Sequence, residues 1–432
     1  MKPSGIEWIG DIPDDWEVYR LKNEVVFVNG YAFDGSELHQ DKEVPVIRIG
    51  DISSGVIDYS STLKTNVKSG LSEYELRKND ILIAMSGATT GKTAIVKTNE
   101  KAYINQRVGI IRATKCNIFI KYLLETKGFF NYIFLVAGGS AQPNISMHNI
   151  LNFQIPKIRL DTQQKVADYL DEKCGEIDAT IAKQKEIIEK LKAYKQSLIS
   201  ETVTKGLDKS APLKPSGIEW IGDIPAHWEV KRIKELFSFG KGLPISKEDL
   251  IENGVPVINY GQIHSKDNNG TSIKDSLIRY VDLNYKNTNM TSLVESGDFI
   301  FADTSEDLDG CGNCIYVDSK YPIFAGYHCI ILRSIKRNSS KYLAYLFQMD
   351  AWRTQIRRDV TGVKVFSISK KILGKSYILL PPRYEQECIV NYLQEKCNEI
   401  DIIINKKQNI IQKLDAYKKS LIFECVTGKR LV

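Results

Sequence analysis

The sequence predicts an α+β protein, with two mixed α/β heads linked by two long antiparallel helices in a pseudo-two-fold arrangement. Two internal repeats predict this class. Residues 2–13, KPSGIEWIGDIP, recur unchanged as residues 214–225, and most positions of residues 169–204 recur as residues 392–427. The first repeat opens each half of the chain and the second closes it. Each half therefore contains a head followed by a tail.

The heads contain short β-rich runs separated by Gly, Asn and Ser, for example residues 44–50, 80–85 and 108–112. Runs of this kind predict strands. A helical stretch is expected at residues 118–135, with its counterpart at residues 341–358. The predicted domains are residues 1–158 and 213–382, the two heads, and residues 159–212 and 383–432, the two helical tails.

The tails carry apolar residues at heptad spacing, which predicts long helices that pair through one narrow stripe. A pseudo-two-fold relation between the copies makes the paired helices antiparallel. The alternative is that each tail packs on its own head. The stripe comprises Leu170, Cys174, Ile177, Ile181, Ile188, Leu191 and Leu198, interrupted by Gln184 and Lys195, and then Leu393, Cys397, Ile400, Ile404, Ile411, Leu414 and Leu421, interrupted by Lys407 and Lys418.

Composition excludes several classes of protein. A hydrophobic content of 43% with 26% charged residues is ordinary for globular chains and excludes a wholly disordered one. The formal charge of +6 permits a nucleic-acid partner without requiring one. The sequence has no apolar run long enough for a membrane span and no secretion signal at its start, so a cytoplasmic location is expected.

The 8 cysteines are expected to be reduced thiols, because disulfides are rare in the cytoplasm. Only Cys311 and Cys314 have the spacing of metal ligands. A structural zinc site usually needs a second pair, and only His328 or Cys329 lies close enough in sequence to contribute. We therefore expect two buried thiols in a glycine-rich turn and no metal site.

The two heads keep their framework and differ at polar positions. Residues 44–52 read VPVIRIGDI where residues 255–263 read VPVINYGQI. Further on, Gln106 and Arg107 correspond to Tyr327 and His328, and Ala141 corresponds to Lys364. Arg, Asn, Gln and Lys can make specific contacts to base edges, so double-stranded DNA with two half-sites fits this divergence. The alternative is surface drift after duplication.

The candidate DNA-binding residues follow from these differences. Lysines and arginines on the heads are expected to contact phosphates, and the other polar positions are expected to read bases. The candidates are Arg48, Asp51, Lys92, Gln106, Arg107, Gln142, Asn144, Lys241, Asn259, Tyr260, Gln262, Tyr327, His328 and Lys364.

The duplicated KPSGIEWIGDIP segments, the VPVI and SGATTGKT segments of the heads, and the paired tails containing AYK and SLI resemble the specificity subunit of type I restriction–modification systems. The resemblance covers nearly the whole chain. It implies a non-catalytic subunit with two target recognition domains, each of which reads half of a split DNA site. It also implies that the antiparallel helices act as the spacer and dock two adenine-N6 methyltransferase subunits, which restriction subunits join. S-adenosylmethionine, ATP and Mg then belong to the partner subunits.

Two copies of one partner need two equivalent surfaces, so the docking and spacer candidates lie on the repeated segments and on both tails. They are Trp8, Trp16, Ile177, Ile181, Ile188, Leu191, Tyr194, Trp220, Trp228, Ile400, Ile404, Ile411, Leu414 and Tyr417.

Three catalytic motifs are incomplete. Residues 86–93, SGATTGKT, lack the first glycine of a phosphate-binding loop, and a strand is expected to follow them where that loop needs a helix. Asp14 and Glu17 lack the lysine of a nuclease motif, and Pro381 and Pro382 do not belong to a methyltransferase loop. No catalytic residue is assigned. An NTPase or nuclease acting alone, or a coiled-coil scaffold without DNA readout, remains the alternative.

Overall fold

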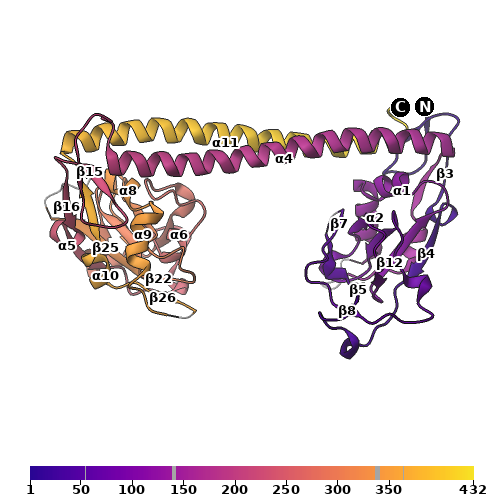
Figure 1. The fold of residues 1–432 in the computed structure, drawn as a ribbon, viewed down its shortest axis with the longest axis horizontal. Helices are drawn as coiled ribbons and strands as arrows, with labels where there is room; N and C mark the ends of the chain where they lie inside the picture. The colour runs from indigo at the N-terminus through magenta and orange to yellow at the C-terminus, as the bar shows by residue number, and fades with distance from the viewer. Residues whose placement is uncertain (54, 139–142, 336–340, 363) are drawn as a thin grey trace. The chain divides into compact units, whose positions relative to one another are not determined.

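The computed structural model of the chain describes residues 1–53, 55–138, 143–335, 341–362 and 364–432. These residues form two compact units, residues 1–185 with 407–432 and residues 186–406. Each unit contains a β-rich head and part of both long helices, α4 (Leu160–Lys205) and α11 (Arg383–Val426) (Figure 1). The division falls inside the helices, so the predicted domain boundaries stay a prediction.

The first head contains a four-stranded sheet in which β9 is central. The residues of β9 are all buried because the strand lies between two apolar clusters: Ile81 and Ile83 face the helical side, and Leu82 and Ala84 face the other. A second sheet includes one parallel pair, β11 with β5. In the four-stranded sheet the strands are ordered β10 (Thr93–Ile95), β9 (Ile81–Ala84), β12 (Val108–Ala113) and β4 (Val25–Asn29). In the second, three-stranded sheet the order is β11 (Tyr103–Ile104), β5 (Val44–Ile47) and β8 (Lys64–Thr65).

Smaller elements complete the first unit. They are the pairs β1 (Lys2–Pro3) with β2 (Asp11–Ile12), β3 (Glu17–Arg20) with β13 (Gln154–Lys157), and β6 (Ile52–Ser53) with β7 (Val56–Ile57), and the helices α1 (Asn117–Leu124), α2 (Lys127–Val136) and α3 (Met147–Leu151).

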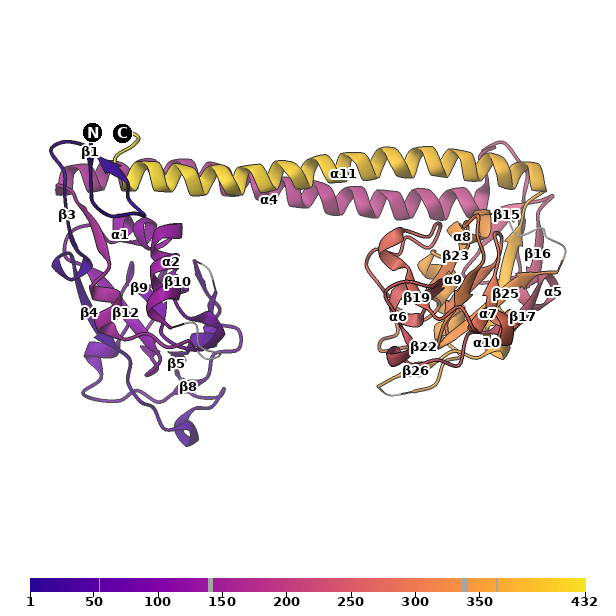
Figure 2. The ribbon, with the colours of Figure 1, turned by 180° about the vertical axis from the view of Figure 1, so that it is seen from behind.

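The second head has the same order in its four-stranded sheet, and its other sheet has one more strand than in the first head (Figure 2). The strands of its first sheet are ordered β17 (Phe237–Lys241), β25 (Cys329–Ser334), β21 (Phe299–Ala302) and β23 (Cys314–Tyr316). The strands of its second sheet are ordered β19 (Arg279–Val281), β18 (Val255–Ile258), β24 (Ile323–Ala325) and β20 (Leu293–Val294). The pairs are β14 (Leu213–Pro215) with β15 (Asp223–Pro225), β16 (Glu229–Arg232) with β27 (Tyr377–Leu380), and β22 (Thr304–Ser305) with β26 (Phe366–Ser367). The helices are α5 (Ile233–Leu236), α6 (Tyr260–Ile263), α7 (Tyr285–Thr288), α8 (Lys341–Leu346), α9 (Asp350–Arg357) and α10 (Lys370–Lys375).

The expected strands at residues 44–50, 80–85 and 108–112 are present as β5, β9 and β12. The helical stretch expected near residues 118–135 is present, and it is divided into α1 and α2. Thr126 lies at the break, where its hydroxyl accepts a hydrogen bond from the Phe129 N–H at 3.3 Å and caps α2. The counterpart stretch is likewise divided into α8 and α9.

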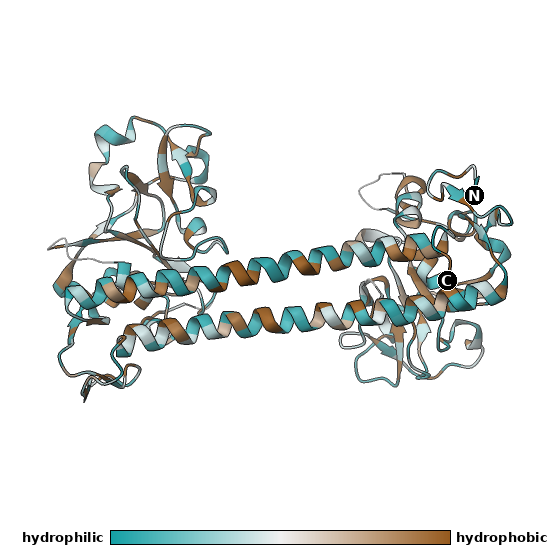
Figure 3. Ribbon diagram, turned by 90° about the horizontal axis from the view of Figure 1, so that it is seen from above, coloured by the Kyte–Doolittle hydropathy of each residue, from teal (hydrophilic) through white to brown (hydrophobic). Residues whose placement is uncertain are grey.

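The long helices pair as the heptad stripe predicts. In the first unit Asp178 of α4 contacts Lys418 of α11, and Gln184, later in α4, contacts Lys407, earlier in α11. The two helices therefore run antiparallel. Most of the stripe is buried, including Ile177, Ile181, Ile188, Ile400 and Ile404, and Figure 3 shows hydrophobic residues recurring along both helices.

Each long helix begins about ten residues before its heptad stripe. The early residues Val166 and Ala167 of α4 belong to the apolar core of the first head. In the second unit, Ile389 of α11 has the same role. The first turns therefore pack on their own head, as the alternative interpretation expected, and the later turns pair with the other helix.

Candidate nucleic-acid interface

One edge of the first head gathers several of the predicted DNA-binding residues. Three segments meet there through backbone hydrogen bonds, because Met85 donates to the Arg107 carbonyl at 2.9 Å and accepts from the Ile145 N–H at 2.9 Å. The turn after β5 joins them, since the Cβ of an alanine at Gly87 would lie 3.5 Å from the Ile49 side chain. This edge presents Gln106, Arg107 and Asn144 as exposed side chains and Arg48 as a half-buried one.

The equivalent edge of the second head is assembled by equivalent bonds. Asp303 donates to the His328 carbonyl at 3.0 Å and accepts from the Ile368 N–H at 2.7 Å. Here the side chains are aromatic. The Tyr260 ring lies 5.6 Å from that of Tyr327 and 5.4 Å from that of His328, between ring centroids. The two heads therefore offer different chemistry at one structural position.

An acidic group that the sequence did not single out belongs to this second edge. Asp303 Oδ1 lies 3.1 Å from Nδ1 of His328, whose side chain is 56% exposed. The position is occupied by the apolar Met85 in the first head. That change of polarity between the repeats is the signal that would have identified Asp303.

Two of the predicted reading residues point inward. Asp51 is 3% exposed, and its carboxylate accepts a hydrogen bond from the Arg48 N–H at 2.8 Å. Asn259 is 0% exposed, while the side chain of Gln262 accepts from its N–H at 3.2 Å. Asp51 and Gln262 thus cap equivalent turns. The expectation of a surface role does not fit Asp51 or Asn259 in this conformation, because solvent does not reach them.

The predicted phosphate contacts lie on exposed turns or strand ends. Lys92 precedes β10, Lys241 ends β17, and Lys364 comes shortly before β26; all three side chains are exposed. Gln142 and Ala141 lie outside the described residues.

The tryptophans of the repeated segments are packing residues. Trp16 is buried against the end of α11, where a Cβ added at Gly428 would lie 2.8 Å from its ring. Trp228 is buried against the end of α4 and donates from Nε1 to Glu385 at 2.9 Å. Trp8 is half-buried and stacks on Phe153 with ring centroids 5.1 Å apart, and Trp220 is also half-buried.

On the helices, the stripe residues serve the helix pair itself. Leu191, Ile411 and Leu414 are half-buried beside the buried isoleucines. Tyr194 and Tyr417, which occupy equivalent positions of the tail repeat, are 59% and 50% exposed. Of the docking candidates on the tails, these two tyrosines are open to a partner.

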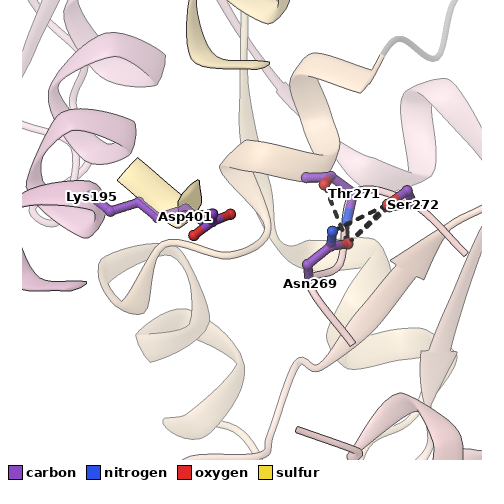
Figure 4. Close-up of polar contacts among 5 residues, drawn as sticks. All are labelled: Lys195, Asn269, Thr271, Ser272 and Asp401. Carbon is purple, nitrogen blue, oxygen red and sulfur yellow. Dashed lines mark hydrogen bonds and ion pairs between the residues drawn. The ribbon is translucent and has the colours of Figure 1, made fainter. Parts of the chain in front are cut away.

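The polar residues that interrupt the stripe make polar contacts across the helices. Gln184 accepts a hydrogen bond from Lys407 at 3.0 Å, and Lys418 lies 2.7 Å from Asp178 in the first unit. In the second unit Lys195 lies 2.7 Å from Asp401, and Figure 4 shows these two side chains together. The same view shows the Asn269 side chain accepting from the Thr271 and Ser272 N–H groups in a loop of the second head.

Two of the three catalytic motifs have other structural roles. The SGATTGKT segment forms a short 3₁₀ turn at Gly87–Thr89 and then enters strand β10, so no helix N-terminus is available for phosphate. Glu17 pairs with Lys157 at 2.6 Å, whereas Asp14 pairs with the N-terminal amine at 3.1 Å. These carboxylates are therefore held by separate cationic partners.

The Cys311 and Cys314 pair is buried, as the sequence indicated. Burial raises the pKa of Cys314 to about 12 and raises that of Cys311 as well, so both remain protonated thiols at neutral pH. Within the described ranges there is no cluster of three or more His, Cys, Asp or Glu side chains suited to a metal ion. No helix in that part of the chain is long and apolar enough to span a membrane.

Comparison with known proteins decides the family. Residues 13–193 and 225–413 match the family described as the type I restriction modification DNA specificity domain. The chain belongs to this family. Specificity subunits of type I restriction–modification systems are non-catalytic.

Curated relatives match along nearly the full chain. The type I restriction enzyme MjaVIII specificity subunit of Methanocaldococcus jannaschii is 23% identical over 97% of this chain and 93% of the relative. The EcoKI specificity subunit of Escherichia coli is 21% identical over 97% of this chain and 90% of the relative.

Solved structures share the fold. A chain from a study of complex assembly and conformational transition of the type I R-M system matches with a TM-score of 0.71 at 16% identity, covering 97% of this chain and 100% of that one. The HsdS subunit from Thermoanaerobacter tengcongensis matches with a TM-score of 0.51 at 15% identity, covering 97% of this chain and 98% of that one. This specificity subunit therefore has two β-rich heads and a pair of long helices, as its sequence predicted.

Proposed function

We propose that this specificity subunit reads a bipartite DNA target, with one half-site bound at the edge of each head. The observation that carries the proposal is the equivalence of the two edges. Their backbones are joined by the same hydrogen bonds, while Arg48, Gln106 and Arg107 are replaced by Asn259, Tyr327 and His328. A shared scaffold with different side chains at one position is what two different half-sites require.

In this proposal the exposed residues contact DNA and the buried ones support them. Lys92, Arg107, Lys241 and Lys364 contact phosphates, which fixes the position of each head on the duplex. Base edges are read by the remaining accessible candidates, which are Arg48, Gln106, Asn144, Tyr260, Tyr327 and His328. Asp51 and Gln262 act by holding the turns that carry Arg48 and Asn259.

We further propose that the helix pair is the spacer between the half-sites and a docking site for two adenine-N6 methyltransferase subunits, which restriction subunits join. Tyr194 and Tyr417 support docking, because two equivalent exposed tyrosines suit two copies of one partner. S-adenosylmethionine, ATP and Mg are then held by those partners, and the complex acts in the cytoplasm.

The test uses the chain assembled with its methyltransferase and a DNA library that has two randomised segments around a variable gap. Bound molecules are sequenced. The proposal expects two short enriched motifs separated by a fixed unread gap. Enrichment without any sequence preference would favour a protein-interaction scaffold. ATP hydrolysis or DNA cleavage by the purified chain alone, lost in Lys92→Ala, would favour the enzymatic alternative.

A further inference from the structure

The buried amide of Asn259 has no hydrogen-bond partner. The residue is 0% exposed, and neither Oδ1 nor Nδ2 makes a hydrogen bond among the described residues. Buried amides are almost always paired, because an unpaired one loses its hydration without compensation. This unsatisfied group lies directly after β18, at the edge where the second head is proposed to read DNA.

A short segment, residues 326–328, runs past this amide, and its first residue packs directly on it. Gly326 lies so close that a Cβ placed on it would be 1.6 Å from the Asn259 Oδ1, so glycine is required beside the amide. Tyr327 follows, and its carbonyl accepts a long hydrogen bond of 3.4 Å from the Tyr260 N–H. This segment, the cover, packs on Asn259 through Gly326. It is held by a 2.7 Å bond from the Gly326 N–H to the Ile258 carbonyl and by the weaker 3.4 Å bond from the Tyr260 N–H.

The last residue of the cover has an unfavourable backbone. His328 has a φ of +54°, in the left-handed region that only a few per cent of residues other than glycine adopt, although histidine is found there more often than most. Its carbonyl accepts from the Asp303 N–H at 3.0 Å, and its ring lies beside Asp303 and Tyr260. Backbone strain of this kind is stored where surrounding contacts maintain it, and it is released when those contacts change.

The first head is built differently at the same place. Asn259 corresponds to Arg48, which is 38% exposed, and Gly326 corresponds to Asn105. Arg107, the counterpart of His328, is not among the residues with positive φ. The two substitutions in the second head are linked, because the glycine provides the space that the buried asparagine occupies. The reading position is accessible in one head and covered in the other.

We propose that Asn259 is a base-reading residue concealed beneath Gly326, Tyr327 and His328, and that binding of the second half-site uncovers it. The inference rests on the proposed function. Opening breaks the 3.4 Å bond from Tyr260 and the 2.7 Å bond from the Gly326 N–H to the Ile258 carbonyl, and it lets the His328 backbone leave the left-handed region. The freed amide then pairs with an adenine in the major groove, whose N7 accepts and whose N6 amine donates, the complement of Nδ2 and Oδ1.

The first experiment replaces the amide with an apolar side chain of similar size, Asn259→Leu. The variant is assembled with the methyltransferase, and methylation of a library with every base at each half-site position is sequenced. We expect discrimination for adenine to fall about 10- to 100-fold at one position of one half-site, the factor carried by a bidentate contact. The other half-site in the same molecule is the control. An unchanged profile at every position would overturn the inference.

The second experiment does not depend on the folding of Asn259→Leu. His328→Ala and His328→Gly both remove the imidazole, so they differ mainly in the cost of the left-handed backbone, which only alanine pays. If binding releases that conformation, His328→Ala binds specific DNA about fivefold more tightly than His328→Gly, whereas His328→Gly is the more stable free protein. Equal affinities, or tighter binding by the glycine variant, would show that His328 stays left-handed on DNA and would contradict the proposal.

The wild-type complex separates the two possible failures. If it shows no sequence preference, the proposed function itself fails. If it reads both half-sites, Asn259→Leu keeps its profile and the two His328 variants bind with equal affinity, only the role of Asn259 and its cover is refuted.

Discussion

Arg112 and Asp80 form an ion pair at the base of the first head's sheet. Two guanidinium nitrogens donate to the carboxylate at 2.9 Å, and Asp80 is 3% exposed. The second head has the equivalent pair, Arg333 with Asp298, at 3.7 Å. The pair recurs in both heads although their reading edges differ, so it belongs to the shared framework.

Removing Arg112 therefore leaves a buried carboxylate without its partner. We expect Arg112→Ala to lower the free energy of unfolding by roughly 3–5 kcal/mol, measured by denaturant titration. Lys157→Ala is the matched control, because its ion pair with Glu17 is exposed to solvent and should contribute little. Similar losses in the two variants would contradict this account of the framework.

Glu125 predicts a dependence of stability on pH. Burial raises the pKa of this carboxyl above its ordinary value of 4.5, and Asp171 and Asp178 add to the rise, while Lys121 and Lys418 oppose it. A raised pKa in the folded state means that the folded protein binds this proton more tightly than the unfolded chain does. The protonated carboxyl therefore adds to the free energy of unfolding. This contribution is complete below pH 4.5 and is lost as pH rises through the folded pKa.

Glu125→Gln removes this titration and introduces the residue found at the equivalent position 348. We expect the unfolding temperature of the variant to exceed that of the wild type by an amount that grows as pH rises from 4.5 towards neutrality. The difference should vanish below pH 4.5. Thermal unfolding across a pH series measures it, and a constant difference at all pH values would show that Glu125 does not titrate in this way.

At the residue scale, the sequence indicates which positions changed between the heads but not which way their side chains point. Asp51 and Asn259 come after the equivalent strands β5 and β18, among polar residues that differ between the heads. From the sequence both were expected at the surface, yet both are buried. A position just after a strand can turn outward or cap the turn, and only the surrounding contacts decide. The left-handed His328 and the close approach of Gly326 likewise depend on non-local packing.

At the scale of elements, the heptad spacing was sufficient to predict the helix pair and its direction, because an apolar stripe of that period has few other ways to be buried. The same spacing did not predict which residues the polar side chains that interrupt the stripe would contact. Asp178 with Lys418 and Asp401 with Lys195 are equivalent under the tail repeat, and Gln184 and Lys407 are equivalent to each other. Polar contacts inside such a stripe favour one register over others.

The charge pairs can be tested by reversal. Asp178→Lys and Lys418→Asp each place like charges together and should lower the unfolding temperature, whereas the double variant restores an ion pair. We expect a coupling energy of about 0.5–1 kcal/mol in the double-mutant cycle. The same cycle on Asp401 and Lys195 is the matched control in the other unit. A coupling of zero in both cycles would refute the role of these pairs in helix register.

At the scale of the whole molecule, the internal repeat was sufficient to predict two heads, because each copy of the opening segment begins a new β-rich domain. The weak charge of +6 did not exclude DNA, because in the proposed complex partner subunits supply further phosphate contacts. The target sequence is beyond prediction, since it depends on the positions of a few side chains at each edge. In the proposed function, the gap length is set by the helix pair that separates the two half-sites.

The spacer role predicts the effect of lengthening the helices. Seven residues inserted between Gln184 and Lys185 and between Lys406 and Lys407 preserve the heptad pattern and keep the polar contacts on either side. At 1.5 Å per residue this adds about 10 Å, so the preferred gap should increase by about three base pairs. The same insertion in α4 alone disrupts the pairing and should abolish binding. An unchanged gap with the double insertion would refute the spacer role, and selection from a library of gap lengths measures it.

The most direct test of the central claim is a map of N6-methyladenine across the genome of cells that express the chain with its methyltransferase. Each map is made for the wild type and for Arg107→Ala, which alters the edge of the first head alone. The account predicts a bipartite methylated motif with a fixed unread gap, and a variant motif relaxed in one half only. A continuous motif, or relaxation of both halves together, would contradict the claim that each head reads its own half-site.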